Sequence, residues 1–436
     1  MKKRLLLTLT LVLSAVILSG CALLPLLVQY MGVRQNDESD VIMEDVTDGM
    51  VAEYEMAAGS FEAGKLMAAP VPMPMYNGMP DFNTEEYADI RENGFRKVQT
   101  SPLSTFSADV DTASYCNLRR MLNDGWTPDE IPGGAVRVEE MLNYFRYNYD
   151  APTGDNRFGV TAEIGDCPWN PEAKLMLLGI RAADAPEKAD EGSNLVFLVD
   201  VSGSMGDPKK LDLVKKALTM LTDALGEKDT VSICTYSDGE EILAEGANPV
   251  RDRTALITAI DRLEAAGYTD GQRGLEQAYE VAMRNYRPRG NNRVIMCSDG
   301  DLNVGITSTS DLHDYVSEKR KTGVYLSVLG FGDGNYKDTK METLADDGNG
   351  NYYYIDSILE ARKVLVEEMT QTLCAVADDV KFQIEFNPAK VAAWRQVGYE
   401  NRALEDADFE NDAKDAGEVG AGACVTVMYE LLPATA

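Results

Sequence analysis

The sequence predicts an α/β protein: a doubly wound, mostly parallel sheet with β-rich segments on either side and a disordered N-terminal tether. Three features predict this fold class. Between residues 193 and 373, continuous apolar runs alternate with stretches in which apolar residues recur every three or four positions. On both sides of that region, apolar residues alternate with polar ones. Residues 22–100 contain an acidic stretch and a Pro-Met run, which are typical of an unfolded linker.

The central region, 193–373, is expected to form the parallel sheet. Apolar runs that are buried on both faces are typical of parallel strands covered by helices. Residues 240–245 are expected to add an antiparallel edge, and a last helix is predicted at 357–373. The first helix is predicted from an apolar stripe at Leu211, Val214, Leu218, Leu221 and Leu225. Strands are predicted at 195–200, 231–236, 293–298, 324–330 and 351–355.

The segment before the central region, 101–192, is expected to be helical first and then β-rich. Short amphipathic helices are predicted near 119–122 and 138–145. Alternation of apolar and polar residues then indicates strands between 158 and 180.

The segment after the central region, 374–436, alternates again at 380–386 and 425–431. We expect these strands to pair with those of the preceding segment into one β domain, with the α/β unit inserted between them. Because the chain stops soon after a strand, a C-terminal part is expected to be missing.

The first 21 residues have the features of an export signal. A basic start, Met1-Lys2-Lys3-Arg4, precedes an apolar core that is shorter than a bilayer-spanning helix. The following Leu18-Ser19-Gly20-Cys21 resembles a bacterial lipobox, which implies cleavage before Cys21 and attachment of lipid to it. The protein is therefore expected in the cell envelope, outside the cytoplasm and anchored by lipid alone. A plain secretory signal and an uncleaved anchor are the alternatives.

Charge narrows the classes of partner. The formal net charge is -31, which disfavours direct binding to nucleic acid or to an anionic membrane surface. Between Gln35 and Gly64 there are nine acidic residues and no basic one. As a flexible coil, the linker 22–100 would span roughly 50 Å. It would hold the folded part away from the membrane.

Oxygen-bearing side chains follow three of the predicted elements. Asp200, Ser202 and Ser204 come directly after the first apolar strand, Thr269 precedes a predicted helix, and Asp299 follows the strand at 293–298. Ligands of doubly wound sheets bind where the carboxyl ends of strands meet. Hard divalent cations take oxygen ligands in that arrangement. The alternative is that Ser202 and Thr269 cap helices and the aspartates merely end strands.

These three loops resemble the metal-ion-dependent adhesion site of the von Willebrand factor type A (VWA) domain, a Rossmann-like α/β fold. The segments 102–115, 386–391 and 397–402 resemble the flanking segments of a bacterial family of A-domain lipoproteins, so the resemblance covers roughly residues 100–436. It implies that Ser202, Ser204 and Thr269 coordinate the ion directly. It also implies that Asp200 and Asp299 act mostly through water and by orienting hydroxyls.

The resemblance also implies a cofactor and a partner. Octahedral oxygen coordination favours Mg²⁺, with Mn²⁺ or Ca²⁺ as alternatives. Neutral hydroxyl ligands leave the ion poorly compensated, so the open position suits a carboxylate from a protein or glycan partner. Binding rather than catalysis is the expected function. The alternatives are a scaffold subunit of an envelope assembly without metal-dependent adhesion, and a metal-dependent hydrolase.

Several motifs of other enzyme classes are missing or misplaced. The sequence has no P-loop motif, no Gly-x-Ser-x-Gly and a single histidine, His313, which argue against nucleotide binding and hydrolase triads. Asp109-Val110-Asp111-Thr112 superficially resembles a phosphatase loop, but that loop follows an apolar run, whereas the mostly polar Ser104-Thr105-Phe106-Ser107 precedes this motif. We expect its carboxylates to serve local structure or docking.

Seven cysteines occur in the chain. Cys234 and Cys297 lie in predicted strands and are expected to be buried thiols. Four others have no spacing that selects a pairing: Cys116, Cys167, Cys374 and Cys424.

Overall fold

The computed structural model describes most of the chain after residue 84. The described residues all belong to one compact unit, and they are 85–108, 111–184, 192–268, 271–300, 309–334, 336–368, 375–411, 414 and 416–434. The predicted signal, Cys21 and most of the predicted linker lie outside them, as does Thr269. Over the ranges that are described, no helix is both long and apolar enough to cross a membrane.

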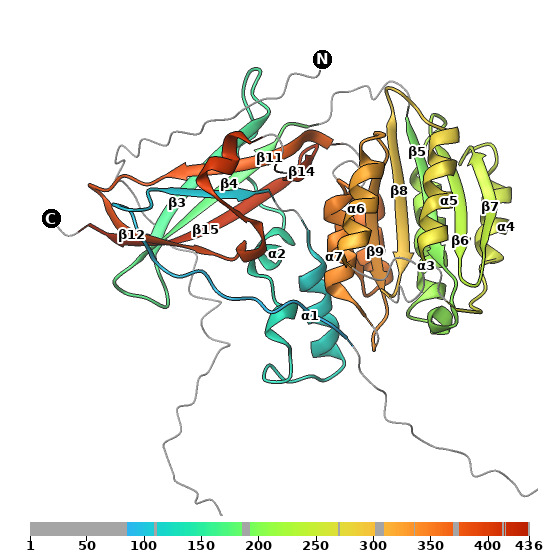
Figure 1. Cartoon of the computed structure of the whole chain (residues 1–436), viewed down its shortest axis with the longest axis horizontal. Coiled ribbons are helices and arrows are strands. Elements are labelled where there is room, and N and C mark those ends of the chain that lie inside the picture. Colours follow the sequence, from blue (N-terminus) through green and yellow to red (C-terminus); the bar gives the residue numbers. More distant parts are fainter. Residues whose placement is uncertain are drawn as a thin grey trace, which may run out of the picture. The chain divides into compact units, whose positions relative to one another are not determined.

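The centre of the molecule is a six-stranded sheet in the order β10-β9-β8-β5-β6-β7 (Figure 1). The edge strand β7 (Glu240–Ala247) is antiparallel, as predicted, and its neighbours are parallel to one another. The parallel strands are β5 (Ser193–Asp200), β6 (Thr230–Tyr236), β8 (Asn291–Ser298), β9 (Tyr325–Phe331) and β10 (Tyr352–Ile355). The predicted doubly wound α/β fold is confirmed.

Helices cover both faces of this sheet, so the strands are buried on each side (Figure 1). One face packs against α3 (Leu211–Ala224), α4 (Arg253–Asp261) and α8 (Ile358–Arg362). The other packs against α5 (Gly271–Arg284), α6 (Thr309–Arg320) and α7 (Asp338–Asp347). Helix α3 forms because its apolar residues fall on one stripe, and Leu211, Val214, Leu218 and Leu221 are all buried.

The predicted last helix, 357–373, differs from the observed one. Helix α8 ends at Arg362, and the chain continues as a π-helical turn, η4 (Lys363–Glu367). The amide of Glu368 donates to the carbonyl of Lys363, five residues back, which is the bond of a π-turn. Residues 369–374 lie outside the described residues.

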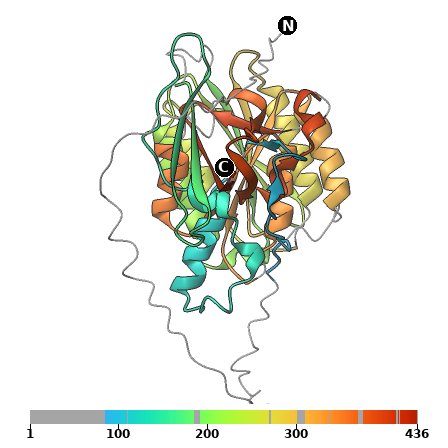
Figure 2. The same ribbon diagram turned by 90° about the vertical axis from the view of Figure 1, so that its left-hand side faces the viewer.

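A second, β-rich module contains a five-stranded sheet in the order β1-β12-β15-β4-β3. Strand β15 of the C-terminal segment pairs with β4 of the N-terminal segment, with Val427 opposite Leu178. Figure 2 shows the green strands of the N-terminal segment beside the red strands of the C-terminal segment. The strands are β1 (Arg96–Lys97), β12 (Val391–Val397), β15 (Cys424–Pro433), β4 (Lys174–Ala182) and β3 (Phe158–Asp166).

The same module contains a four-stranded sheet in the order β13-β2-β11-β14. It also mixes the two segments, because β11 pairs with β2 and places Phe382 opposite Phe106. Its strands are β13 (Ala403–Leu404), β2 (Leu103–Ser107), β11 (Ala375–Glu385) and β14 (Gly417–Gly420). The expectation that the α/β unit is inserted into one β domain is confirmed.

Two helices of the N-terminal segment join the modules, α1 (Ala113–Asn123) and α2 (Val138–Asn143). Cys116 of α1 lies in the same apolar core as Tyr352 and Tyr354 of β10. Strand β10 is an edge of the central sheet, and α1 therefore shields an edge that would otherwise present apolar surface.

Asp111, the second aspartate of the Asp109-Val110-Asp111-Thr112 motif, has a structural role. One carboxylate oxygen accepts a hydrogen bond from the amide of Tyr352 at 2.9 Å. The other lies 3.4 Å from Arg402, in the short helix η5 (Glu400–Arg402). Asp111 thus ties β10 to the C-terminal segment, in keeping with the docking role expected of this motif. Asp109 and Val110 lie outside the described residues.

Part of the predicted linker is folded against these helices. Glu85 forms a buried ion pair with Arg120 of α1 at 2.9 Å, and Glu86 forms an isolated parallel bridge with Lys337. Further along, β1 pairs with β12. The described residues of the predicted linker, from 85 on, therefore pack against the folded part, and Glu85 does so through a buried basic partner.

Buried charges tie the flanking segments to α7. Arg137, just before α2, pairs with Glu140 and lies 2.5 Å from Asp338 of α7. Arg402 of η5 pairs with Asp346 of α7 at 2.6 Å. Since a buried charge is tolerated only with its partner, the Arg137 cluster holds the N-terminal segment against α7. The half-buried pair of Arg402 and Asp346 adds a contact from the C-terminal segment.

Arg137→Met should destabilise the protein by about 3–5 kcal/mol, because it leaves Glu140 and Asp338 buried without their cation. The measurement is the free energy of unfolding in urea. The matched control is Arg253→Met, which breaks an exposed, solvent-screened pair with Asp223 and should change that free energy far less. Equal effects of the two substitutions would contradict the assigned role of Arg137.

Candidate metal site

The candidate site lies beside β5, where the order in which the chain adds strands to the central sheet reverses. The chain passes from β5 to β6 on one side, whereas β8 lies on the other side of β5. Asp200 is the last residue of β5, and Asp299 directly follows β8. Both carboxylates are 0% exposed. In a doubly wound sheet, ligands bind in the crevice at the carboxyl ends of the strands beside this reversal.

Asp200 is held by three donors. Oδ1 accepts a hydrogen bond from the amide of Ser202 at 2.9 Å. Oδ2 accepts from the hydroxyl of Tyr236 at 3.2 Å and from the hydroxyl of Ser298 at 3.0 Å. Burial and, secondarily, the negative charge of Asp299 raise the pKa of Asp200 to about 6.

Ser202 and Ser204 face each other in the loop after β5. Their Oγ atoms lie 3.1 Å apart. Ser202 precedes a short 3-10 helix, η3 (Gly203–Gly206), but its side chain makes no capping hydrogen bond there. The alternative in which Ser202 serves as a helix cap is therefore not what the structure shows.

The loop that leads to Thr269 is joined to the loop after β5. The amide of Gly203 donates to the carbonyl of Gly267 at 3.0 Å, and the amide of Ala266 donates to the carbonyl of Val201 at 2.8 Å. Gly267 has φ +82, and a Cβ there would lie 2.5 Å from a carboxylate oxygen of Asp238, so only glycine fits. Thr269 itself lies outside the described residues.

Asp299 is paired with a lysine that the sequence did not indicate as a site residue. Nζ of Lys210, at the start of α3, lies 2.9 Å from Oδ2 of Asp299. Tyr236 and Ser298, which bind Asp200, were also missed. One signal was present for Lys210: a lysine at the start of a helix opposes the helix dipole, and such local conflicts occur at functional sites.

The donor set suits a hard divalent cation. Asp200, Ser202, Ser204 and Asp299 offer only oxygen atoms, from two carboxylates and two hydroxyls. Oxygen donors of this kind are preferred by Mg²⁺, Mn²⁺ and Ca²⁺. Two buried carboxylates close enough for one to raise the pKa of the other also require a positive charge nearby.

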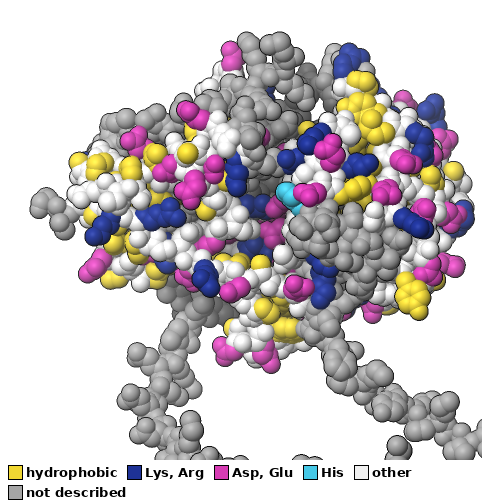
Figure 3. Space-filling model, viewed as in Figure 1, with side chains coloured by type: hydrophobic (Ala, Val, Ile, Leu, Met, Phe, Trp, Pro, Cys, Tyr) yellow, Lys and Arg dark blue, Asp and Glu magenta, His cyan; other side chains and the backbone are white. Residues whose placement is uncertain are grey.

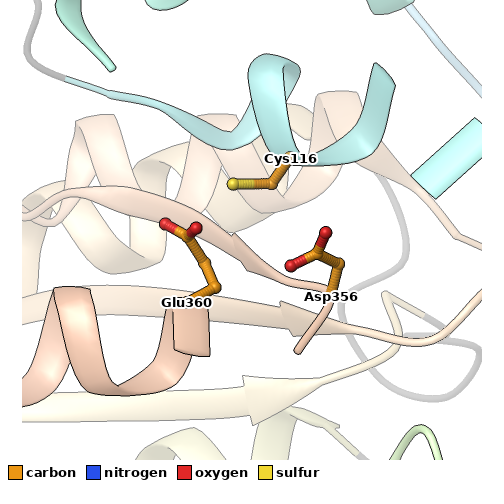
Figure 4. Close-up of side chains that lie close together, drawn as sticks. All are labelled: Cys116, Asp356 and Glu360. Atoms are coloured by element: carbon orange, nitrogen blue, oxygen red, sulfur yellow. The ribbon is translucent and has the colours of Figure 1, made fainter. Parts of the chain in front are cut away.

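A second group of possible ligands is already occupied by a cation. Sγ of Cys116 and carboxylate oxygens of Asp356 and Glu360 lie within 4.8 Å of one another (Figure 4). The guanidinium of Arg119 lies 2.6 Å from Asp356 and 2.9 Å from Glu360, and it donates to Sγ of Cys116 at 3.6 Å. This cluster is an arginine clamp between α1 and α8 rather than a metal site.

The remaining cysteines and the histidine do not contribute to the candidate site. Cys234 and Cys297 are buried, as predicted, and burial raises the pKa of the Cys234 thiol to about 12. The cysteines that the structure describes are free thiols, and Cys374 lies outside it. His313 pairs with Asp347 at 2.7 Å beside a polar cleft of about 550 Å³ (Figure 3). None of the four described site residues lines that cleft.

The raised pKa of Asp200 predicts a specific dependence of stability on pH. The folded protein without metal binds a proton at Asp200 up to about pH 6, whereas the unfolded chain releases it near pH 4. The contribution of Asp200 to stability should therefore fall as pH rises from about 4 to about 6. Asp200→Asn should remove about 3 kcal/mol of that fall. The measurement is urea unfolding in EDTA across this range, and parallel curves for the two proteins would contradict the assignment.

Models of known families match three parts of the chain. The von Willebrand factor type A domain matches residues 194–368. A model described as von Willebrand factor matches residues 81–177, and the C-terminal part of the uncharacterized protein YfbK matches residues 371–436.

Individual proteins are also similar. The protein YfbK of Escherichia coli is 42% identical over 355 residues, covering 80% of this chain and 61% of that protein. The protein sll0103 of Synechocystis is 31% identical over 168 residues, covering 38% of this chain and 39% of that protein. The chain thus spans less than two thirds of the length of these relatives. A solved structure, a von Willebrand factor type A protein from Catenulispora acidiphila, aligns with a TM-score of 0.42 and 18% identity over 66% of each chain.

The match to the family model coincides with the central sheet and its helices. The E. coli relative extends the similarity into the flanking segments. Residues 194–368 thus match the von Willebrand factor type A domain and have its α/β fold, and the chain is similar to YfbK over 355 residues.

Proposed function

We propose that the protein binds a protein or glycan partner through a divalent cation held at the carboxyl ends of β5 and β8. Asp200, Ser202, Ser204, Thr269 and Asp299 would hold the ion, which we expect to be Mg²⁺, with Mn²⁺ or Ca²⁺ as alternatives. VWA domains typically mediate protein interactions, and the match to this domain supports binding rather than catalysis.

One observation carries the proposal. Two fully buried carboxylates, Asp200 and Asp299, lie at the carboxyl ends of β5 and β8, as do the facing hydroxyls of Ser202 and Ser204. Burying like charges together is unfavourable unless a cation compensates them. A divalent ion bound there would compensate both carboxylates and would use hydroxyls that serve no capping role.

The partner is expected to present a carboxylate. The site residues lie in loops at the end of the sheet, and the neighbouring Tyr268 is 81% exposed. A bound ion reverses the local sign of charge in a protein whose net charge is -31. An exposed aromatic residue beside the ion would add apolar contact area to the same interface.

The proposed location is the cell envelope. The segment 1–21, with Cys21 at its end, supports attachment of lipid and a tethered, extracytoplasmic protein. The acidic linker would then separate the binding site from the membrane surface.

A second candidate function, a scaffold subunit that binds its neighbours without a metal, is favoured by Lys210. Its ammonium group already neutralises Asp299 at 2.9 Å. Under this alternative the lysine would take the place of the ion permanently. Metal titration separates the two functions.

Mg²⁺ should raise the stability of the wild-type protein relative to EDTA, by about 2.7 kcal/mol when free Mg²⁺ is about 100 times its Kd. Ser204→Ala should lose most of this increase because it removes a direct ligand. The measurement is thermal and urea unfolding of the full chain in detergent. The matched control is Asp212→Asn, at an exposed position of α3, which should keep the full increase. Identical stability of the wild type with Mg²⁺ and with EDTA would contradict metal binding.

A further inference from the structure

Lys210 is an unusual residue for a site that would receive a cation. Its side chain is 7% exposed, its partner Asp299 is 0% exposed, and their charged atoms lie 2.9 Å apart. Lys210 caps the amino end of α3, where the helix dipole already contributes positive charge. Its neighbour Lys209 has the ordinary surface arrangement, with 59% of its side chain exposed.

The fold makes room for the aliphatic stem of Lys210. The stem passes Gly332, directly after β9, where a Cβ would lie 2.3 Å from Cε of the lysine. Gly332 also has φ +78, which favours glycine. The hydroxyl of Tyr354 donates to the carbonyl of Gly332. The ammonium group therefore reaches Asp299 along a path that the ends of β8, β9 and β10 define together.

We propose that Lys210 is a built-in counter-cation of the metal site: it compensates Asp299 when no ion is bound and lowers the affinity of the site for divalent cations. The inference rests on the proposed metal-dependent function. It adds a residue that determines the affinity and the ligand preference of that site.

The physical reason is competition for one carboxylate. Without an ion, removing the lysine would take away the cation that lies 2.9 Å from the buried carboxylate of Asp299. With an ion bound, the ammonium group and the metal repel each other at short range in a poorly screened interior. Lys210 thus stabilises the metal-free protein more than the metal-bound one. By linkage, its removal must tighten metal binding.

The lysine also affects what the bound ion attracts. Asp200 and Asp299 contribute two negative charges, whereas the ion and Lys210 together contribute three positive ones. The loaded site therefore keeps a surplus positive charge. Such a site favours an anionic ligand over water or a neutral hydroxyl.

The experiment measures the Kd of Mn²⁺ by electron paramagnetic resonance and by calorimetry on the full chain in detergent. Lys210→Met should lower the Kd on the order of tenfold or more, because a positive charge near the ion is removed. Lys210→Arg should stay within a few-fold of the wild type because it keeps the charge. Lys209→Met, one residue away and with the same change in charge, should leave the Kd unchanged.

Unfolding in urea supplies a readout that is independent of binding. In EDTA, Lys210→Met should be clearly less stable than the wild type, and saturating Mn²⁺ should close most of that gap. Should Lys210→Met not fold in EDTA, Lys210→Gln replaces it, because glutamine is neutral but still donates a hydrogen bond. Glutamine should also lower the Kd.

The outcomes separate this inference from the proposed function. An unchanged Kd in Lys210→Met, with Mn²⁺ still bound by the wild type, overturns the role of Lys210 and leaves the metal site standing. Binding by Lys210→Met but not by the wild type supports the counter-cation and overturns metal-dependent adhesion in the native protein. Absence of binding in both overturns the two proposals together.

Discussion

The structure of the candidate site depends on one constraint: two carboxylates, Asp200 and Asp299, are buried side by side at the centre of a parallel sheet. Each needs donors or a cation, and the surrounding groups supply them. Ser298, Tyr236 and the amide of Ser202 bind Asp200, while Lys210 binds Asp299. These bonds come from β6, β8 and the start of α3, so compensating the buried charge also fixes how the loops are arranged.

Pairing of charged side chains also holds the flanking segments against the central domain. Arg119 and Arg120 of α1, Arg137 before α2 and Arg402 of η5 all insert into acidic groups on or beside the VWA domain. These contacts reach towards the candidate site, because Arg120 lies over the ring of Tyr354, and the Tyr354 hydroxyl donates to the carbonyl of Gly332 beside Lys210. Helix α1 therefore supports the strand ends that carry the candidate site.

Periodicity in the sequence was enough to predict the parallel strands of the central sheet to within a few residues, because buried parallel strands are continuous apolar runs. In the flanking segments it missed the strands β1, β2, β12, β13 and β14. It also predicted the pairing of the two flanking segments. It failed where long-range charge pairing decides the structure. Residues 85–100 read as linker because their acidic side chains have no visible partners in the sequence. Lys210 and Tyr236 were missed because no local pattern shows which buried carboxylate a distant side chain will reach. The π-turn at Lys363–Glu367 was also missed, because apolar spacing does not distinguish it from an α-helical turn.

The central claim is that a divalent cation binds between the hydroxyls of Ser202 and Ser204. Anomalous diffraction from crystals grown with Mn²⁺ tests it most directly. We predict an anomalous peak within about 2.2 Å of both Oγ atoms, since Mn²⁺ binds oxygen at slightly longer distances than Mg²⁺. We also predict that the peak disappears in Ser204→Ala crystals. A wild-type map without that peak, with Lys210 still on Asp299, would contradict the account.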